Sequence, residues 1–254
     1  MWLTLDIGNS SIKGGLFDGP QLRRTFRLMP QRDAGSDDIA VLLAPHLTGV
    51  TISRAGVCSV VPERTPVVTT AVVQTTGVEP LRVHSEMPLP FELAYDTPHT
   101  LGADRLAAAA AGWVLFGSAN HDRSVVVIDA GTAVTYEIIE RPGRYVGGAI
   151  APGPDLLQAA LHHGTAQLPS IPLVLPDRVI GRSTREAIQS GVMYGFVDAV
   201  RGMLVRIGDQ LGEIPLTVAT GGWSTVLKAH LPEIQHAEPD LVLHGIRILM
   251  EESA

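Results

Sequence analysis

The sequence predicts an α/β fold built from two similar halves, and three observations support this prediction. Short apolar runs that end in glycine turns alternate with helix-like segments, as is typical of α/β proteins. The run before Asp129 leads into an Ala-Gly-Thr turn, and the run before Asp6 leads into an Ile-Gly-Asn turn. These aspartates lie 123 positions apart in a chain of 254 residues, so each half opens with its own copy of the motif. We expect two lobes, residues 1–118 and 119–254, that flank a cleft.

The first half begins with a three-strand meander and then becomes mixed. Turn residues between apolar runs predict strands over 2–7, 12–17 and 22–28. A helix follows over 37–44, and Pro45 is expected to end it because proline lacks a backbone N–H. The other elements expected here are strands at 49–54, 56–61 and 81–84, a helix starting at Pro62 and Glu63, and an irregular proline-rich segment at 87–99.

The second half repeats this order after a helix that begins near Asp104, in an alanine-rich run. Three strands are predicted at 124–130, 133–140 and 144–150. Ser183 and Glu186 have the spacing of a capping box for a long helix. The remaining predicted elements are helices at 156–161, 183–212 and 241–252, a proline-punctuated loop at 170–179, and a strand at 216–219 that breaks at a Thr-Gly-Gly turn.

Composition limits the classes of function. The net charge of −7 and the lack of a basic run argue against general binding to nucleic acid or a membrane surface. Cys58 is the one cysteine, which fits a reducing compartment and a core position. No signal peptide is recognised, and the longest apolar stretch, 106–116, is too short to span a bilayer. We therefore expect a cytoplasmic protein.

Three glycine turns that follow strands carry the chemical interpretation: 6–11, 129–133 and 220–222. The sequence has no Walker A motif, dinucleotide fingerprint, zinc-ligand spacing or GxSxG elbow. A triphosphate needs backbone amides near its oxygens, a metal ion and a nearby cation. The first turn can supply amides and small polar side chains, and Asp6 can hold Mg²⁺ through water.

Two further residues have both a functional and a plain structural interpretation. Lys13 is one of only two lysines beside seventeen arginines, which favours a point charge on phosphate, but it also fits the exposed face of a strand. Asp104 suits a catalytic carboxylate, but a carboxylate in the first turn of a helix is also stabilised by the helix dipole.

The sequence contains several separated motifs: DIGNSSIK at 6–13, SVVP at 59–62, Tyr95 with Pro98 before GADR at 102–105, DAGTAVT at 129–135, GGAIAPG at 147–153, STREAIQSG at 183–191 and TGG at 220–222. In this order and spacing, they resemble the motifs of type III pantothenate kinases. The resemblance covers nearly the whole chain. It implies the duplicated ribonuclease H-like fold of actin-like ATPases and ATP-dependent phosphorylation of pantothenate, the first step of coenzyme A synthesis.

The resemblance also implies roles for individual residues. Asp104 matches the general base, and Asp129 matches the ligand of a monovalent cation, K⁺ or NH₄⁺. The residues matched to ATP are Asp6, Ile7, Gly8, Asn9, Ser10, Ser11, Ile12, Lys13, Thr132, Gly221 and Gly222. The residues matched to pantothenate are Tyr95, Gly102, Ala103, Asp104, Arg105 and Thr184. Family members are homodimers whose substrate pocket is completed at the interface.

Some positions keep alternative interpretations. The segment before Thr184 lacks the family's usual Asn, so the substrate contact there is less defined. Trp223 could stack on adenine or serve the core and the start of a helix. His99 could line the pocket or be exposed, and the pair His162 and His163 is expected to have a structural or solvent role.

Three rival functions belong to different classes. A sugar kinase of the same superfamily would share the phosphate turns, but GADR with Tyr95 favours pantothenate. A non-catalytic transcription accessory factor is expected to lack the acid at 104 or 129, and both are present. An actin-like filament or chaperone ATPase would need a longer chain.

Overall fold

The computed structural model describes residues 1–117 and 122–253, which form two compact units. The first unit contains Met1–Leu115 and Asp240–Ala254, and the second contains Phe116–Pro239. The predicted boundary between residues 118 and 119 lies outside the described residues. The predicted lobes place the terminal helix in the second lobe, whereas the structure packs it within the first unit.

The sheet of the first unit has the strand order β3-β2-β1-β4-β5. The predicted meander is confirmed as β1 (Trp2–Ile7), β2 (Ile12–Asp18) and β3 (Gln21–Leu28), which pair in antiparallel fashion. β4 (Arg54–Ser59) and β5 (Leu81–Arg82) continue the sheet in parallel with β1. The carboxyl ends of β1 and β4 therefore meet at one edge, beside the first glycine turn.

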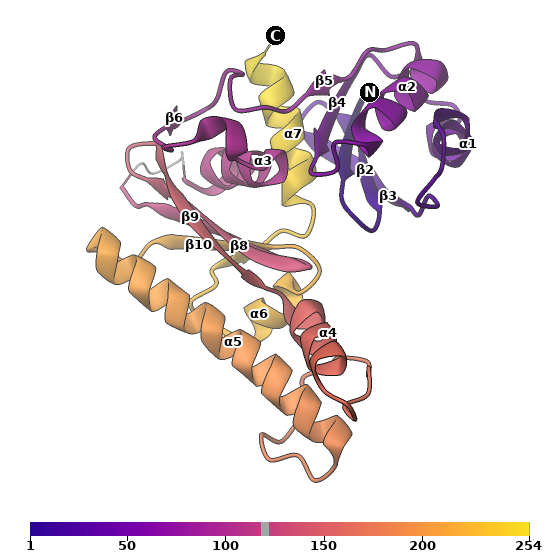
Figure 1. Ribbon diagram of the computed structural model, residues 1–254. Helices are drawn as coiled ribbons and strands as arrows, with labels where there is room; N and C mark the ends of the chain where they lie inside the picture. The colour runs from indigo at the N-terminus through magenta and orange to yellow at the C-terminus, as the bar shows by residue number, and fades with distance from the viewer. Residues whose placement is uncertain (118–121, 254) are drawn as a thin grey trace. The chain divides into compact units, whose positions relative to one another are not determined.

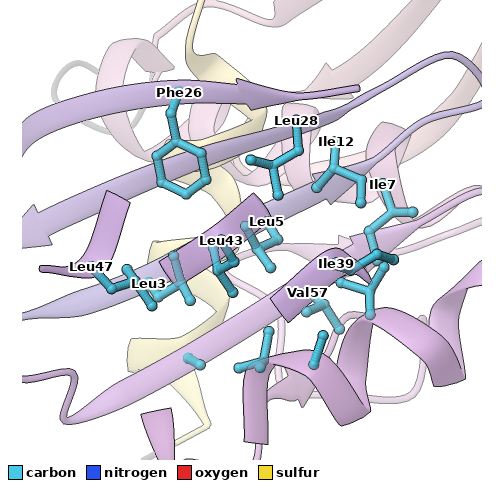
Figure 2. Packing of buried hydrophobic residues seen from close by; sticks show 14 of the residues in the cluster. Leu3, Leu5, Ile7, Ile12, Phe26, Leu28, Ile39, Leu43, Leu47 and Val57 are labelled. Atoms are coloured by element: carbon cyan, nitrogen blue, oxygen red, sulfur yellow. The ribbon is translucent and has the colours of Figure 1, made fainter. Parts of the chain in front are cut away.

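One face of this sheet packs on α1 (Ser36–Leu47) and α2 (Arg64–Thr76). Figure 2 shows the strand side chains gathered with those of α1 in a single apolar layer. Leu3, Leu5 and Ile7 alternate along β1 toward this layer, so Thr4 and Asp6 belong to the opposite face. Burial of the apolar residues therefore fixes the side of the sheet on which Asp6 lies.

The opposite face of the first sheet is covered by α7 (Leu241–Glu252), which also lies beside α3 (Ala103–Gly112) (Figure 1). Residues Ala107–Ala111 of α3 are all fully buried. A side chain on Gly245 of α7 would overlap the carbonyl oxygen of Ala107, so the two helices approach backbone to backbone. The alanine run thus serves close helix packing as well as helix propensity.

The second unit repeats the topology of the first. Its described strands follow the order β11-β10-β7-β8-β9, which matches β5-β4-β1-β2-β3 strand for strand. β7 is antiparallel to β8 and parallel to β10, as β1 is to β2 and β4. The bounds are β7 Val125–Ala130, β8 Ala133–Glu140, β9 Arg144–Pro152, β10 Leu216–Thr220 and β11 His236–Ala237. The duplicated α/β fold predicted from the paired aspartates is confirmed.

The helices that accompany this sheet in the described part of the unit are α4 (Pro154–Gly164), α5 (Thr184–Leu211) and α6 (Ser224–His230). α5 is the long helix that stands out in Figure 1. Half of its predicted capping box is present, because Ser183 Oγ accepts the Glu186 N–H at 3.3 Å. The Glu186 carboxylate instead accepts the Arg182 N–H at 2.6 Å, one residue earlier than the motif requires.

Local predictions failed where packing overrode sequence signals. Pro45 does not end α1, which continues to Leu47, a residue buried in the core. The predicted strand 49–54 forms no strand before Arg54. The irregular segment 87–99 contains β6 (Glu92–Leu93) and leads into a 3₁₀ turn, η1 (Pro98–Thr100). β11 has only two residues and no pattern in the sequence that predicts it.

The helix that starts at Ala103 continues beyond Gly112 as a π-helical turn, η2 (Trp113–Gly117). Across residues 1–117 and 122–253, no helix combines the length and apolar character required to cross a membrane.

Candidate active site

The first predicted phosphate turn, Gly8–Ser11, connects β1 to β2. The Gly8 N–H donates to the Ser11 carbonyl at 3.0 Å and closes the turn. Asn9 and Ser10 are exposed at its tip, whereas Ser11 is buried. Gly8, Asn9 and Ser10 can therefore present amides and polar side chains to a bound anion.

Ile7 and Ile12 flank this turn as directly paired residues, and both are fully buried. Their side chains belong to the apolar core, so only their backbone could face a nucleotide. The apolar pair therefore anchors this hairpin in the core, while its chemistry depends on the polar residues at its tip and on its other face.

The SVVP segment at the end of β4 is bonded to the region of this turn. The Val60 N–H donates to the Ile7 carbonyl at 3.2 Å, and Ser59 Oγ accepts the Thr65 hydroxyl at 2.7 Å. Arg64, at the start of α2, donates to the Gly8 carbonyl at 3.4 Å. These contacts attach the phosphate turn to β4 and α2, which fixes the direction of its amides.

Lys13 lies directly opposite Asp6 on the paired strand. Its ammonium is 2.9 Å from the carboxylate of Asp240, the N-cap residue of α7. Arg27, on β3, donates to Ser11 Oγ at 2.6 Å. Sequence reasoning missed Arg27, Arg64 and Asp240, although the predicted meander could have placed Arg27 beside Lys13.

Asp104 lies in the first turn of α3, after the N-cap residue Gly102 and Ala103. Its Oδ1 accepts the Arg105 N–H at 2.8 Å. Burial raises the pKa of the Asp104 carboxyl, and this effect outweighs the hydrogen bond and the charge of Arg105, which lower it. A carboxylate with a raised pKa is a stronger base than an ordinary aspartate, so the helix-start position and a catalytic role are compatible.

Two other residues predicted to bind substrate belong to the same unit. Arg105 is 9% exposed, so its guanidinium is held in protein surroundings, where charge-assisted hydrogen bonds are strong. Tyr95 is half-buried and lies between β6 and η1, the segment that leads directly into α3. His99 of η1 is exposed.

Three sequence motifs meet around Asp129 in the second unit. Asp129 lies near the end of β7, and the Gly131 N–H donates to the Ala133 carbonyl at 3.0 Å. The Gly153 N–H, at the end of the GGAIAPG motif, donates to the Thr132 carbonyl at 2.9 Å. The Trp223 N–H, after the TGG motif, donates to the Ala130 carbonyl at 3.0 Å.

Gly221 has a crowded environment in this cluster. Its φ of +83° lies in the left-handed region, which disfavours residues with a side chain. A Cβ at this position would overlap Asp129 Oδ1 and would lie 2.6 Å from the Ala130 carbonyl oxygen. The neighbouring Gly222 is exposed, has no atom within 4 Å of such a Cβ, and is available to a ligand.

The two acidic hairpins differ in length and in charge. Four residues separate the paired residues Ile7 and Ile12, but only three separate Ala130 and Val134. The second turn is therefore one residue shorter than the alignment of the two motifs predicts. Asp6 faces Lys13, whereas Asp129 faces Thr135.

Asp129 is flanked by hydroxyl groups from both neighbouring strands. Thr135 on β8 and Thr220 on β10 are its direct register partners, and Thr220 is 1% exposed. A carboxylate between hydroxyl oxygens, close to backbone carbonyls, suits a hard cation. Within residues 1–117 and 122–253, no cluster of three or more His, Cys, Asp or Glu could hold a metal ion.

The remaining candidates also belong to the second unit. Thr132 is exposed in the shorter turn, and Thr184 is exposed as the first residue of α5. Trp223 packs partly against two apolar clusters, and its indole N–H donates to Asp155 at 3.1 Å. These contacts support the structural interpretation of Trp223. His162 contacts the Leu168 carbonyl at 2.8 Å, in keeping with a structural role.

Comparisons of sequence identify relatives along the whole chain. A relative from Moorella thermoacetica, named type III pantothenate kinase, is 34% identical over 258 residues and is covered completely, as is this chain. A relative of the same name from Legionella pneumophila strain Corby is 37% identical over 256 residues, covering 98% of this chain and 97% of the relative.

Solved structures share the fold at low sequence identity. A protein from Campylobacter jejuni described as a Baf family transcriptional activator superposes with a TM-score of 0.62 at 20% identity, covering 98% of both chains. A polyphosphate/ATP-glucomannokinase from Arthrobacter sp. strain KM gives a TM-score of 0.52 at 16% identity, covering 99% of this chain and 97% of that one. These similarities establish the actin-like ATPase and sugar kinase fold.

The family model described as type III pantothenate kinase matches residues 2–206, which include both acidic hairpins and Asp104. Together with the full-length relatives, this match shows that the chain belongs to the type III pantothenate kinase family.

Proposed function

We propose that this protein transfers the γ-phosphoryl group of ATP to the primary hydroxyl of pantothenate, which yields 4'-phosphopantothenate and ADP. The observation that carries the proposal is the family match over residues 2–206, supported by relatives similar along their full length. The reaction is the entry step of coenzyme A biosynthesis.

Asp104 acts as the general base in this proposal. The pantothenate hydroxyl oxygen attacks the γ-phosphorus, the bond between that phosphorus and the β,γ-bridging oxygen breaks, and ADP leaves. The hydroxyl proton passes to Asp104, whose raised pKa favours its acceptance. Because phosphoryl transfer depends mainly on positioning and charge, the base supplies only part of the rate enhancement.

ATP binds through the glycine turns of both units. Residues 6–13 receive the phosphates, with amides at Gly8–Ser11 and positive charge from Lys13. Mg²⁺ would be held by the phosphates and, through water, by Asp6, and when bound it offsets charge on the transferring group. Thr132, Gly221 and Gly222 contact the nucleotide from the second unit.

A monovalent cation, K⁺ or NH₄⁺, binds at Asp129. The hydroxyl groups of Thr135 and Thr220 on the register-paired strands support this assignment, because they add neutral oxygen ligands without adding charge. Such a cation supplies positive charge to the polyphosphate. The strand partners of Asp129, Thr135 and Thr220, are uncharged and cannot supply it.

Pantothenate binds next to Asp104. Arg105 suits the substrate carboxylate because a guanidinium can form two parallel hydrogen bonds with it. Tyr95, Gly102, Ala103 and Thr184 complete the pocket in a homodimer, with residues contributed across the interface. The enzyme acts in the cytoplasm, in line with its single buried cysteine.

A coupled ADP-release assay tests the proposal directly. The purified protein with MgATP and KCl should release ADP on addition of pantothenate, and the release should need all three components. Glucose and N-acetylmannosamine serve as alternative acceptors, since sugar kinases share this fold. Phosphorylation of a sugar but not of pantothenate would overturn the proposal.

A further inference from the structure

Three charged residues form a row across the first sheet, next to the Gly8–Ser11 turn. Asp6 on β1 is directly opposite Lys13 on β2, and Lys13 is directly opposite Arg27 on β3. Residues paired in this way project from the same face of a sheet. The row therefore places one carboxylate and two cations at the base of the turn.

The charge of Lys13 is largely offset within the unit. Its ammonium lies 2.9 Å from Asp240, and Asp6 is its neighbour in the row. Two carboxylates thus accompany this lysine. The side chain of Arg27 brings the second positive charge of the row, and without it the remaining three groups would sum to a net negative charge.

Arg27 is also directed at the turn by a hydrogen bond. Its Nη1 donates to Ser11 Oγ at 2.6 Å, while the residue as a whole is exposed. A guanidinium carries five N–H donors in a rigid fork, so this bond leaves further donors beside the turn. Because Ser11 Oγ accepts from Arg27, the Ser11 hydroxyl hydrogen remains available to an acceptor.

We propose that Arg27 is a nucleotide-binding residue whose guanidinium contacts the polyphosphate of ATP next to the Gly8–Ser11 turn. Arginine is suited to this task because its fork matches phosphate oxygens bidentately and keeps its charge at every working pH. The inference rests on the proposed function, since it assigns a further contact to the same ATP site.

Equilibrium binding of ATP, ADP and AMP in the presence of Mg²⁺, without pantothenate, tests the inference by calorimetry. Arg27→Gln should weaken ATP binding about 10- to 100-fold, the range for a hydrogen bond to a charged group. The loss should be smaller for ADP and absent for AMP, and Arg27→Lys should restore part of the ATP affinity. Arg23→Gln is the matched control, because it removes one charge from the same strand at an exposed ion pair with Asp18.

The pattern of losses separates phosphate contact from a purely structural role. Equal losses for all three nucleotides, or a loss no larger than that of Arg23→Gln, would overturn the inference. Ser11→Ala should weaken ATP binding less than Arg27→Gln does. An equal effect would mean that Arg27 acts only by positioning Ser11, and would also overturn the inference. If the unaltered protein binds ATP tightly but does not phosphorylate pantothenate, the proposed function is wrong and the inference on Arg27 is not affected.

Discussion

Asp104 is placed so that its environment favours the protonated form. Burial raises its pKa, although the Arg105 N–H and guanidinium act in the opposite direction. The same burial that makes the carboxylate a better base makes its ionised form costly to the fold. A single side chain therefore links activity and stability, and both can be measured.

Replacing Asp104 with Asn should lower kcat by roughly 10²- to 10⁴-fold, because a general base contributes that much. Binding of ATP and pantothenate should persist, since Asn keeps the shape and the acceptor oxygen. Steady-state kinetics with direct binding measurements provide the check. Asp96→Asn, a nearby exposed turn residue, is the control. Near-normal turnover in Asp104→Asn would remove Asp104 from this role.

The Asp104→Asn variant should also unfold at a higher temperature than the unaltered protein at neutral pH. The folded-state pKa is raised, so the ionised carboxylate destabilises the fold above that pKa, and this cost disappears as the pH falls through it. The difference in Tm should therefore shrink on acidification. A constant difference across pH would contradict burial of the charge as its cause.

Asp129→Ala should abolish the stimulation of activity by K⁺. The remaining oxygens at this position, from Thr135 and Thr220, carry no charge and cannot hold the cation alone. The ratio of rates in KCl and in tetramethylammonium chloride is the measurement. Asp122→Ala should keep the ratio of the unaltered protein, and a variant at 129 that still responds to K⁺ would place the cation elsewhere.

At the scale of single elements, the TGG turn shows how backbone geometry selects sequence. Gly221 combines a φ of +83° with close contact to Asp129 and Ala130, whereas Gly222 beside it is open. The two neighbouring glycines therefore form a matched pair for substitution.

Gly221→Ala should destabilise the fold by about 1–3 kcal/mol, the cost of forcing a strained backbone position, and should weaken ATP binding by displacing Asp129. Gly222→Ala should be close to neutral in stability. Urea unfolding followed by circular dichroism measures the difference. Equal stability of the two variants would mean that the turn adopts another conformation in solution.

The hairpins also show what the sequence could and could not predict. Short apolar runs separated by turn residues predicted the strands on both sides of Asp6 and of Asp129. The shorter second turn could not be predicted, because the residues of the two motifs align without a gap. Only the register of the paired strands shows the difference in length. The predicted meander could have placed Arg27 beside Lys13, whereas Asp240 could not be predicted because it belongs to a helix more than 200 positions away.

At the scale of the whole molecule, the duplicated topology was predictable and the grouping of the helices was not. The repeated Asp-x-Gly motif predicted two copies of one fold, and the order β11-β10-β7-β8-β9 corresponds to β5-β4-β1-β2-β3. Nothing in residues 241–252 distinguishes a helix that covers the second sheet from one that covers the first. Its contacts with Ala107 and with the sheet at Gly56 are tertiary features.

The proposed pocket, shared between the subunits of a homodimer, predicts complementation between inactive variants. Asp104→Asn and Thr184→Ala should each be nearly inactive alone if Thr184 contacts the substrate of the partner's Asp104. Subunit exchange should then restore about a quarter of full activity, because half of the dimers are mixed and each holds one intact site. No recovery, or sedimentation of the protein as a monomer, would refute the shared pocket.

The position of α7 in the first unit has a consequence for synthesis on the ribosome. The sheet formed by the first strands lacks its covering helix until the entire second unit has been translated, since α7 follows it in the chain. The apolar surface around Gly56 and Gly15, which Met250, Ile246 and Leu243 later cover, is thus left open in the nascent protein. We expect chaperones to bind this early intermediate. A chain that terminates before α7 should be prone to aggregation.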